Sequence, residues 1–391
     1  MNTNVKIKSL DHFGRGISHI EGKVVFIKNT LPGEEVEIKI TNTKKNYLEG
    51  DVEKYISQSK SRIIPECPYY GICGGCDISH ISYKEQINFK KEKFENILKI
   101  DNPEVIPSNK EKNYRNKISL KVKDSVWGYN KEKSHLVVEI DNCLLAKKSI
   151  NKLLESKKLF NIENGEVVIR SNYNDELLIS ISSSKKVKID INNLIIDNKI
   201  AGIIVNDRIV YGKNYFLEVI NGYTFKVNYK SFFQVNLDIL SKVFDILKIN
   251  KYKNIVDLYC GVGSLGIAVN KEKLWGIEEA DSSVKDAIYN AKINNQKNNF
   301  YIKGDSSTLS KIEERIDLLI VDPPRSGISK ETINNILESN IPKVIYMSCD
   351  PHTLSRDLKI LQDKYEVEKS YLLDIFPETY HVESIIVLNI K

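Results

Sequence analysis

The segment VDLYCGVGSLG, residues 256–266, combines an apolar strand, a glycine turn and the first residues of a helix. Its three glycines, at 261, 263 and 266, spell G-x-G-x-x-G, and glycine lets the backbone approach a ligand closely. Glu278 follows the next apolar strand, where an acid can hold ribose hydroxyls. The segment therefore predicts a nucleotide-binding α/β domain, but it fits either NAD or S-adenosylmethionine (SAM).

Apolar strands and helical stretches alternate along the chain from about residue 221 onward. This alternation predicts a doubly wound, largely parallel α/β sheet. Because ligands of such sheets bind beyond the carboxyl ends of the strands, polar residues that follow strands are candidate site residues. The strands are expected at NIVDLYC (254–260), KLWGIEE (273–279), DLLIVDPP (317–324), KVIYMSC (343–349) and SIIVLNI (384–390).

The Asp-Pro-Pro sequence that ends one of these strands, at 322–324, separates the two cofactors. It is typical of SAM-dependent methyltransferases that act on bases, whereas hydride transfer has no such requirement. Rigid prolines would present backbone carbonyls and Asp322 to cofactor and base. Asp305 ends the intervening strand and could reach the adenine. We therefore expect SAM, although a plain strand-ending turn is the alternative.

Cys349, in YMSCDPHTLSRDL, is the candidate nucleophile. Carbon 5 of uracil reacts poorly with a sulfonium methyl group, but addition of a thiolate to carbon 6 makes an enolate whose carbon 5 can attack. Amides at the start of the following helix could hold the thiolate. A cysteine at a strand end is more often a small core side chain, but the polar neighbours Ser348, Asp350 and His352 argue against burial.

The reaction also needs a general base to remove the proton from carbon 5. Glu383 immediately precedes the last apolar strand, which could carry it to the same edge of the sheet. His381 competes for this role, and His352 is nearer to Cys349 in the sequence. The residues alone do not choose between Glu383 and His381.

Three of the six cysteines, Cys67, Cys73 and Cys76, fall in one loop. Clustered cysteines in a reducing compartment more often hold metal than form disulfides. Cys143 is the candidate fourth ligand, because the remaining two cysteines belong to the C-terminal region. Four thiolates can hold zinc or an iron–sulfur cluster.

The N-terminal residues 1–57 alternate apolar and polar residues in short runs separated by turn residues. This pattern predicts a small antiparallel barrel of about five strands. Residues 11–40 resemble the TRAM domain, an OB-like barrel found on RNA-modifying enzymes, although a barrel that serves only as a spacer is the alternative.

The middle of the chain is expected to hold a loop over 59–79, a helix over 83–98 and a mixed β region over 115–217. Residues 110–133 hold eight Lys or Arg against three acids, with aromatic residues between them. Such a stretch suits phosphate contact and base stacking, but a solvated strand face is as good an interpretation.

The composition, 41% hydrophobic and 28% charged with a net charge of +6, is that of a globular protein. The sequence holds no apolar run of membrane-span length, and its first residues lack a signal-peptide core. We expect a cytoplasmic monomer that does not associate with membranes.

Five motifs, DLYCGVGSLG, SFFQVN, DPPRSG, SCDPHTLSRDL and HVESIIVL, occur in an order that resembles the bacterial RNA uracil-5-methyltransferase family over the whole chain. The resemblance implies Cys349 as nucleophile and Glu383 as base. Ser264 departs from the family, some members of which carry Asn there. The expected cofactor contacts are Gln234, Tyr259, Gly261, Gly263, Glu278, Asp305 and Asp322.

The resemblance also implies an architecture and a substrate. The ribosomal-RNA branch carries a [4Fe–4S] cluster at positions that match Cys67, Cys73, Cys76 and Cys143, with structural zinc as the alternative. Barrel and cysteines together favour 23S ribosomal RNA over the T-loop uridine of tRNA. The expected multidomain α/β chain has a TRAM barrel (1–58), an iron–sulfur and RNA-binding α+β domain (59–217) and a Rossmann-like methyltransferase domain (218–391).

Two other functions compete with this one. An exocyclic-amine methyltransferase also uses Asp-Pro-Pro, but such enzymes usually place an aromatic residue after the prolines, where this chain has Arg325. A non-catalytic RNA-binding or assembly factor on a methyltransferase fold would not need Cys349, Asp322 and Glu278.

Overall fold

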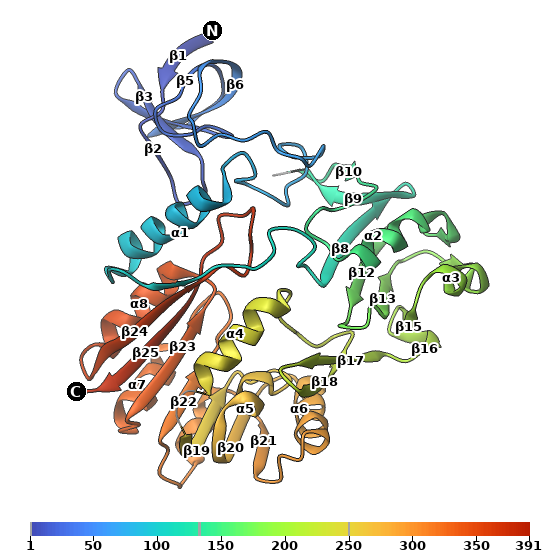
Figure 1. Cartoon of the computed structure of the whole chain (residues 1–391), viewed down its shortest axis with the longest axis vertical. Coiled ribbons are helices and arrows are strands. Elements are labelled where there is room, and N and C mark those ends of the chain that lie inside the picture. Colours follow the sequence, from blue (N-terminus) through green and yellow to red (C-terminus); the bar gives the residue numbers. More distant parts are fainter. Residues whose placement is uncertain (1, 132–133, 249–250) are drawn as a thin grey trace. The chain divides into compact units, whose positions relative to one another are not determined.

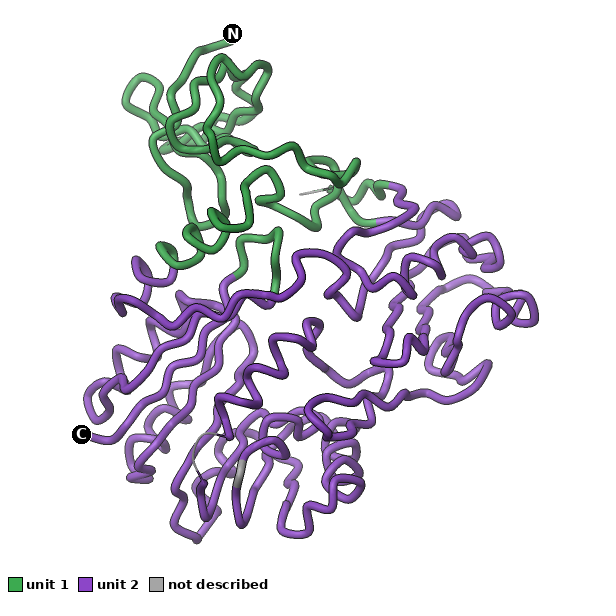
Figure 2. The backbone as a smooth tube through the Cα atoms, in the orientation of Figure 1, with its two compact units in different colours: residues 1–93, 129–138, 376–381 green, residues 94–128, 139–375, 382–391 purple. Residues whose placement is uncertain are grey.

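A computed structural model describes residues 2–131, 134–248 and 251–391 of the chain. The chain divides into two compact units (Figure 2). Unit 1 comprises residues 1–93, 129–138 and 376–381, and unit 2 comprises the rest. Residues 132 and 133, at the end of the basic stretch, lie outside the described part.

Unit 1 contains a six-stranded sheet in the order β1-β5-β6-β4-β3-β2. Alternate residues of its strands point inward and form a core of valine, isoleucine and leucine side chains. We predicted about five antiparallel strands, but the structure has six, and β4 pairs with β6 in parallel. The strands are β1 (Asn2–Lys6), β2 (Ser9–Leu10), β3 (Gly16–Ile20), β4 (Lys23–Ile27), β5 (Glu35–Thr43) and β6 (Tyr47–Ser57).

A buried ion pair joins this sheet to the segment that follows it. Glu34 is fully buried, and its two carboxylate oxygens accept hydrogen bonds from the Arg62 guanidinium at 2.6 and 2.7 Å. The same carboxylate accepts the backbone amides of Leu31 and Ser59. Burial opposes the charged carboxylate, but these partners more than offset it and lower the pKa of Glu34. The helix predicted after the loop is α1 (Tyr83–Leu98).

A seven-stranded sheet, β10-β9-β8-β12-β13-β15-β16, forms the middle of the chain. The pairs β9–β8, β8–β12, β12–β13 and β15–β16 are antiparallel, and β13 and β15 pair in parallel. The strands are β8 (Lys117–Lys123), β9 (Val126–Asn130), β10 (Val137–Glu139), β12 (Gly165–Ser171), β13 (Leu177–Ser182), β15 (Ile200–Val205) and β16 (Arg208–Gly212). Around them lie α2 (Lys148–Glu155), η1 (Lys157–Leu159), α3 (Ile191–Asp197), the pair β11 (Phe160–Asn161) and β14 (Lys188–Ile189), and the hairpin β17 (Tyr215–Ile220) and β18 (Tyr223–Asn228).

The C-terminal part of the chain builds an eight-stranded sheet in the order β21-β20-β19-β22-β23-β25-β24-β7 (Figure 1). β25 runs antiparallel to both its neighbours, and the other pairs are parallel. The strands are β7 (Glu104–Ile106), β19 (Lys251–Leu258), β20 (Asn270–Glu278), β21 (Asn299–Lys303), β22 (Leu318–Val321), β23 (Lys343–Ser348), β24 (Tyr365–Leu373) and β25 (Glu383–Ile390). β7 comes from a segment that the sequence assigns to the central region.

Helices cover both faces of this sheet, as expected of a doubly wound fold. On one face, η2, α7, α8 and the end of α1 share an apolar core with the strands, and α4, α5 and α6 lie on the other (Figure 1). No helix of the described residues is long and apolar enough to cross a membrane. The helices are α4 (Leu237–Leu247), α5 (Ser264–Ala268), α6 (Asp281–Ile293), η2 (Ser306–Lys311), α7 (Lys330–Glu338) and α8 (Pro351–Leu361).

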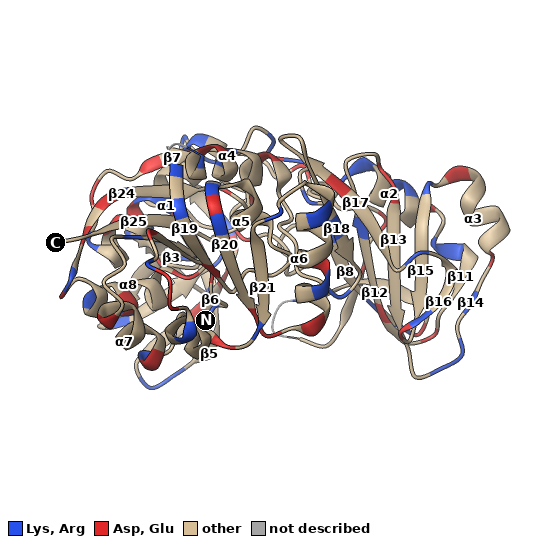
Figure 3. Ribbon diagram, turned by 90° about the horizontal axis from the view of Figure 1, so that it is seen from below, with Lys and Arg blue, Asp and Glu red and all other residues tan. Residues whose placement is uncertain are grey.

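Charged residues of both signs are interspersed along most elements, for instance on α6 (Figure 3). The net charge of +6 is therefore not concentrated in one long run of the chain. A function that depends on charge has to be sought in local clusters.

Candidate active site

Cys349 and Glu383 lie at the same edge of the eight-stranded sheet. Ser348, the last residue of β23, pairs with Ser384 of β25. Because these strands are antiparallel, the next residues in register are Cys349 and Glu383. The reversed direction of β25 thus places its first residue at the carboxyl end of β23, beside the candidate nucleophile.

Asp322 and Arg325 complete an electrostatic cluster with these two residues. Both lie on the loop that follows β22, which pairs with β23 in parallel. Asp322 raises the pKa of both Cys349 and Glu383, and the Arg325 guanidinium lowers both. The sequence pointed to Asp322, but it gave Arg325 no role in this cluster.

Burial is the largest influence on the ionisation of these groups. Glu383 is 6% exposed, and its carboxylate accepts no hydrogen bond from any described residue. Burial, and then the charge of Asp322, raises the pKa of Glu383 to about 8. Burial also raises the pKa of Asp322, to about 7. A buried carboxylate of this kind is a stronger base than one in water.

The prediction that helix amides hold Cys349 as a thiolate does not apply to the free protein. The Asp350 side chain caps α8 by accepting the amides of His352 and Thr353. Burial, followed by the charges of Glu383 and Asp322, raises the pKa of Cys349 to about 11. Cys349 is nevertheless partly exposed, whereas the thiol of Cys260 is buried. Of the two cysteines in this region, only Cys349 can reach a substrate.

The loop that carries Asp322 and Arg325 is fastened to α8, the helix that follows Cys349. The fully buried Asp357 accepts the Ile328 amide at 3.1 Å and the Tyr346 hydroxyl at 2.7 Å. Arg356 donates to the carbonyl oxygens of Ser326 and Ile328. The N-terminal end of α8 therefore follows the candidate nucleophile, and Arg356 and Asp357 in its next turn hold the loop that begins with Asp-Pro-Pro.

The glycine turn after β19 has backbone geometry that favours glycine. Gly261 and Gly263 have φ values of 53° and 79°, and Tyr259 adopts 65° although it carries a side chain. A Cβ atom at Gly263 would lie 2.7 Å from the Tyr301 hydroxyl. Tyr301 therefore packs closely against one side of the turn, which leaves the other side of the turn for the ligand.

Glu278 at the end of β20 is held where the sequence predicts a ribose contact. Its carboxylate accepts the Gly261 amide at 3.0 Å and the Ala280 amide at 2.8 Å. The acid and the glycine turn are thus fixed to each other. Asp305 caps η2 by accepting the amide and hydroxyl of Ser307, which lowers its pKa.

Sequence reasoning missed Asp257, the next-to-last residue of β19. It is fully buried; one carboxylate oxygen accepts the Gly266 amide at 2.9 Å and the other has no partner among the described residues. Burial raises its pKa to about 7. An acid inside an otherwise apolar strand was the signal available in the sequence.

Gln234 lies on a loop, residues 231–236, that is tied to the residue before β8. Its carbonyl accepts the Asn116 side chain at 3.1 Å. The preceding strand β18 is held by α6, because the fully buried Asn290 exchanges hydrogen bonds with the amide and carbonyl of Lys226. The same Asn290 amide donates to Val262 in the glycine turn at 3.0 Å. One side chain thus connects β18, the strand before the Gln234 loop, to the glycine turn.

The competing base and the predicted metal ligands are placed as follows. His381 belongs to unit 1, where its ring packs against Phe376 and Tyr380.

None of the six cysteines forms a disulfide. Among the described residues, no group of three or more His, Cys, Asp or Glu side chains has an arrangement that could hold a metal ion. Cys67, Cys73 and Cys76 lie in unit 1 and Cys143 in unit 2.

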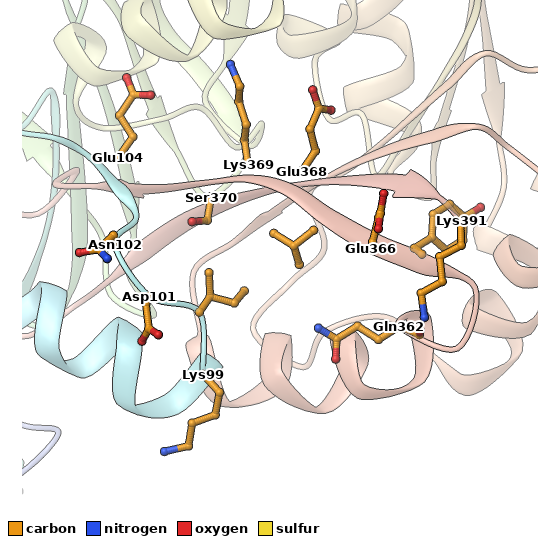
Figure 4. A pocket seen from close by; sticks show the side chains of 13 residues that line it. Lys99, Asp101, Asn102, Glu104, Gln362, Glu366, Glu368, Lys369, Ser370 and Lys391 are labelled. Carbon is orange, nitrogen blue, oxygen red and sulfur yellow. Dashed lines mark hydrogen bonds between the residues drawn. The ribbon is translucent and has the colours of Figure 1, made fainter.

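A pocket of about 810 Å³ lies at the other end of β24 (Figure 4). Lys99, Tyr365 and Lys391 are among the residues that line it. Because β24 pairs Tyr365 with Ile390 and Leu373 with Glu383, this pocket faces the edge of the sheet opposite to Cys349. It holds none of the candidate site residues.

Comparisons with known proteins identify the family of the chain. The chain matches the tRNA (uracil-5-)-methyltransferase family over residues 82–391 and the TRAM domain over residues 3–52. An uncharacterized RNA methyltransferase of Aquifex aeolicus is 35% identical over 98% of both chains. Another, from Caldanaerobacter subterraneus, is 32% identical over 97% of this chain and 96% of the relative.

The fold also matches a solved structure over nearly its full length. The crystal structure of Pyrococcus abyssi tRNA (uracil-54, C5)-methyltransferase in complex with S-adenosyl-L-homocysteine has a TM-score of 0.81 and 24% sequence identity. The match covers 98% of this chain and 99% of that one. The predicted TRAM domain and methyltransferase fold are confirmed. The chain is therefore a SAM-dependent RNA methyltransferase that belongs to the tRNA (uracil-5-)-methyltransferase family.

Proposed function

We propose that this enzyme methylates carbon 5 of a uridine in 23S ribosomal RNA through a covalent bond between Cys349 and carbon 6 of the base. The observation that carries the proposal is the register of β23 and β25, which brings Cys349 beside Glu383 and the loop of Asp322. A thiol and a base at one position are the two groups that this chemistry needs.

Cys349 gives its thiol proton to water and adds its thiolate sulfur to carbon 6, and the electrons of the carbon 5–carbon 6 double bond move toward oxygen 4. SAM, when bound, supplies the methyl group that carbon 5 takes up. Glu383 then accepts the proton from carbon 5. The sulfur leaves carbon 6, and the double bond is restored. Arg325 is the cation that favours the Cys349 thiolate, because its charge opposes the effect of burial on the thiol pKa.

RNA that contains 5-fluorouridine tests this chemistry. Fluorine cannot leave as a proton does, so the wild-type enzyme should form a methylated covalent adduct that survives denaturing electrophoresis. Cys349→Ala should form none, although SAM still binds, whereas Cys260→Ala should form the adduct because its sulfur is buried. Methylation without any adduct would show a different reaction, such as transfer to an exocyclic amine. RNA binding without methylation would show an assembly factor.

A tRNA T-loop uridine is the second candidate substrate. The full-length fold match to a tRNA (uracil-54, C5)-methyltransferase favours it. Ribosomal RNA is supported by the family resemblance of the cysteine set. In vitro methylation of 23S fragments and tRNA transcripts, followed by mass-spectrometric mapping, decides between the two.

We also propose that Cys67, Cys73, Cys76 and Cys143 bind a [4Fe–4S] cluster. Four thiols that form no disulfide are the donor set that such a cluster uses. Asn151 holds the loop of Cys143 by bonding its backbone amide and carbonyl at 2.9 and 3.0 Å. No step of the methyl transfer requires this cluster, so its role is structural or in RNA binding.

A further inference from the structure

Three cationic side chains, Arg115, Lys117 and Arg170, gather at one end of the seven-stranded sheet. Lys117 of β8 pairs directly with Arg170 of β12, so the two side chains share one face. Burial, and then the charges of Arg170 and Arg115, lowers the pKa of Lys117 to about 8, while the charge of Glu166 opposes this shift. The cations are thus close enough to repel one another.

None of these three cations forms a salt bridge with a carboxylate of the described residues, and Glu166 acts on Lys117 only through its charge. Arg170 is only 5% exposed; its one hydrogen bond is from a terminal nitrogen to the Ser231 carbonyl at 2.6 Å, and its Nε has no partner. The nearby Glu166 is already bonded to Ser119 and Lys121. Buried cations without a counter-charge destabilise a protein unless an anion binds them.

The cluster is anchored beside a segment of the active site. Ser231, which accepts from Arg170, begins the loop that carries Gln234. Asn116, between the other two cations, donates its backbone amide to Val235 at 3.0 Å and its side chain to Gln234 at 3.1 Å. Any anion held by the cluster would therefore lie next to the loop expected to contact the methyl donor.

We propose that Arg115, Lys117 and Arg170 form a binding site for a phosphodiester group of the RNA substrate, next to the target nucleotide. The inference rests on the proposed function only in that the substrate is RNA. Guanidinium and ammonium groups are the side chains that recognise phosphate, and RNA carries one phosphate per nucleotide. In the free protein the three cations repel one another. A bound phosphate group is attracted to all three.

Salt-dependent RNA binding tests the site. Lys117→Gln should raise the Kd of a fluorescent hairpin RNA about tenfold and reduce the slope of log Kd against log salt by about 0.7–0.9, the value of one phosphate contact. Lys123→Gln is the matched control, because Lys123 lies on the same face of β8 but is exposed and far along the strand. This control should leave the slope unchanged, and both variants should bind SAM like the wild type.

The thermal stability of the free protein gives an independent readout. Lys117→Gln should raise the Tm, because it removes repulsion, whereas a merely structural Lys117 would make the variant less stable. Inorganic sulfate should stabilise the wild type more than Lys117→Gln. Because Arg170→Gln can fail to fold, the Lys117 variant carries the test.

The outcomes separate this inference from the proposed function. A wild-type slope with Lys117→Gln, or a Tm below that of the wild type, would overturn the phosphate site while leaving covalent methylation intact. Failure of the 5-fluorouridine adduct in the wild type, with normal RNA binding and a reduced slope for Lys117→Gln, would overturn the mechanism and support the site.

Discussion

Glu383 joins the chemistry of the site to the stability of the fold. Burial and the neighbouring Asp322 hold its pKa at about 8, well above the ordinary value of 4.5. A raised carboxyl pKa means that the folded protein binds this proton more tightly than the unfolded chain. The resulting stabilisation is complete below about pH 4.5 and is lost as the pH rises to about 8. The buried position of Glu383, the proposed base, thus lowers the stability of the folded protein near neutral pH.

Glu383→Gln should therefore be more stable than the wild type at pH 8. Glutamine has no proton to lose, and a rise in pKa from 4.5 to about 8 at about 1.4 kcal/mol per unit sets an upper limit of about 5 kcal/mol on the gain. This gain in stability over the wild type should shrink toward pH 5. Thermal unfolding from pH 5 to pH 9 measures it, with the exposed Glu366→Gln as control. Equal pH profiles for Glu383→Gln and the wild type would show that Glu383 is ionised at little cost.

The residues that the sequence predicts for the site differ from those it misses in one physical respect. Cys349 and Glu383 stand at strand ends, where the sequence marks polar residues as candidates for the site even though it does not give the direction of β25. Asp257 and Arg170 are buried within strands, and their importance depends on what surrounds them in space. The raised pKa of the Cys349 thiol could not be predicted from the sequence either. It depends on residues such as Glu383, which is 34 residues away along the chain.

At the scale of elements, α6 holds the cofactor region through two asparagines one turn apart. Asn290 bonds both backbone groups of Lys226 in β18 and also Val262 in the glycine turn. Asn294 bonds both backbone groups of Thr224 in the same strand but does not bond the glycine turn. The pair therefore provides a variant and its matched control.

Asn290→Ala should raise the KM for SAM about tenfold, which corresponds to about 1.4 kcal/mol, while the KM for RNA changes little. Asn294→Ala should lower the Tm to a similar extent, because each loses about 1 kcal/mol per hydrogen bond, but leave the KM for SAM unchanged. Steady-state kinetics and SAM titration calorimetry measure both. Equal effects of the two variants on SAM would reduce Asn290 to a structural contact.

The ion pair between Glu34 and Arg62 should dominate the stability of the segment after the N-terminal barrel. Glu34→Gln leaves a half-paired, partly buried guanidinium, which typically costs about 3–5 kcal/mol. Hydrogen exchange of residues 29–62 should accelerate strongly, whereas the exposed neighbour Glu35→Gln should have no such effect. If hydrogen exchange of this segment is unchanged in Glu34→Gln, packing of the barrel is sufficient to hold the segment without the ion pair.

Elements with long, clear periodicity were predictable from the sequence, whereas a very short strand and the direction of a strand were not. The helix over 83–98 and the strands around 254–260 and 343–349 were confirmed. β7 has only three residues, too few for any periodic signal. The direction of β25 is also invisible in its composition, yet that reversal brings Glu383 to Cys349.

At the scale of the whole molecule, the two compact units do not follow the order of the sequence. Unit 1 takes residues 129–138 and 376–381 in addition to 1–93. Boundaries drawn from composition assume continuous domains, so they cannot anticipate such exchanges. All the candidate catalytic and cofactor residues nevertheless lie in unit 2, which holds residues 94–128, 139–375 and 382–391.

The cysteine set gives the last prediction, because it decides what the protein carries besides its substrates. Anaerobically purified wild type should contain about four irons per chain and be brown. Cys143→Ser should lose most of the iron, whereas Cys260→Ser should keep it, because Cys260 is buried beside the glycine turn. Chelation should lower the Tm of the wild type more than that of Cys143→Ser, since metal binding stabilises the folded state. A colourless wild type that contains one zinc would replace the iron–sulfur proposal with a structural zinc site on the same thiolates.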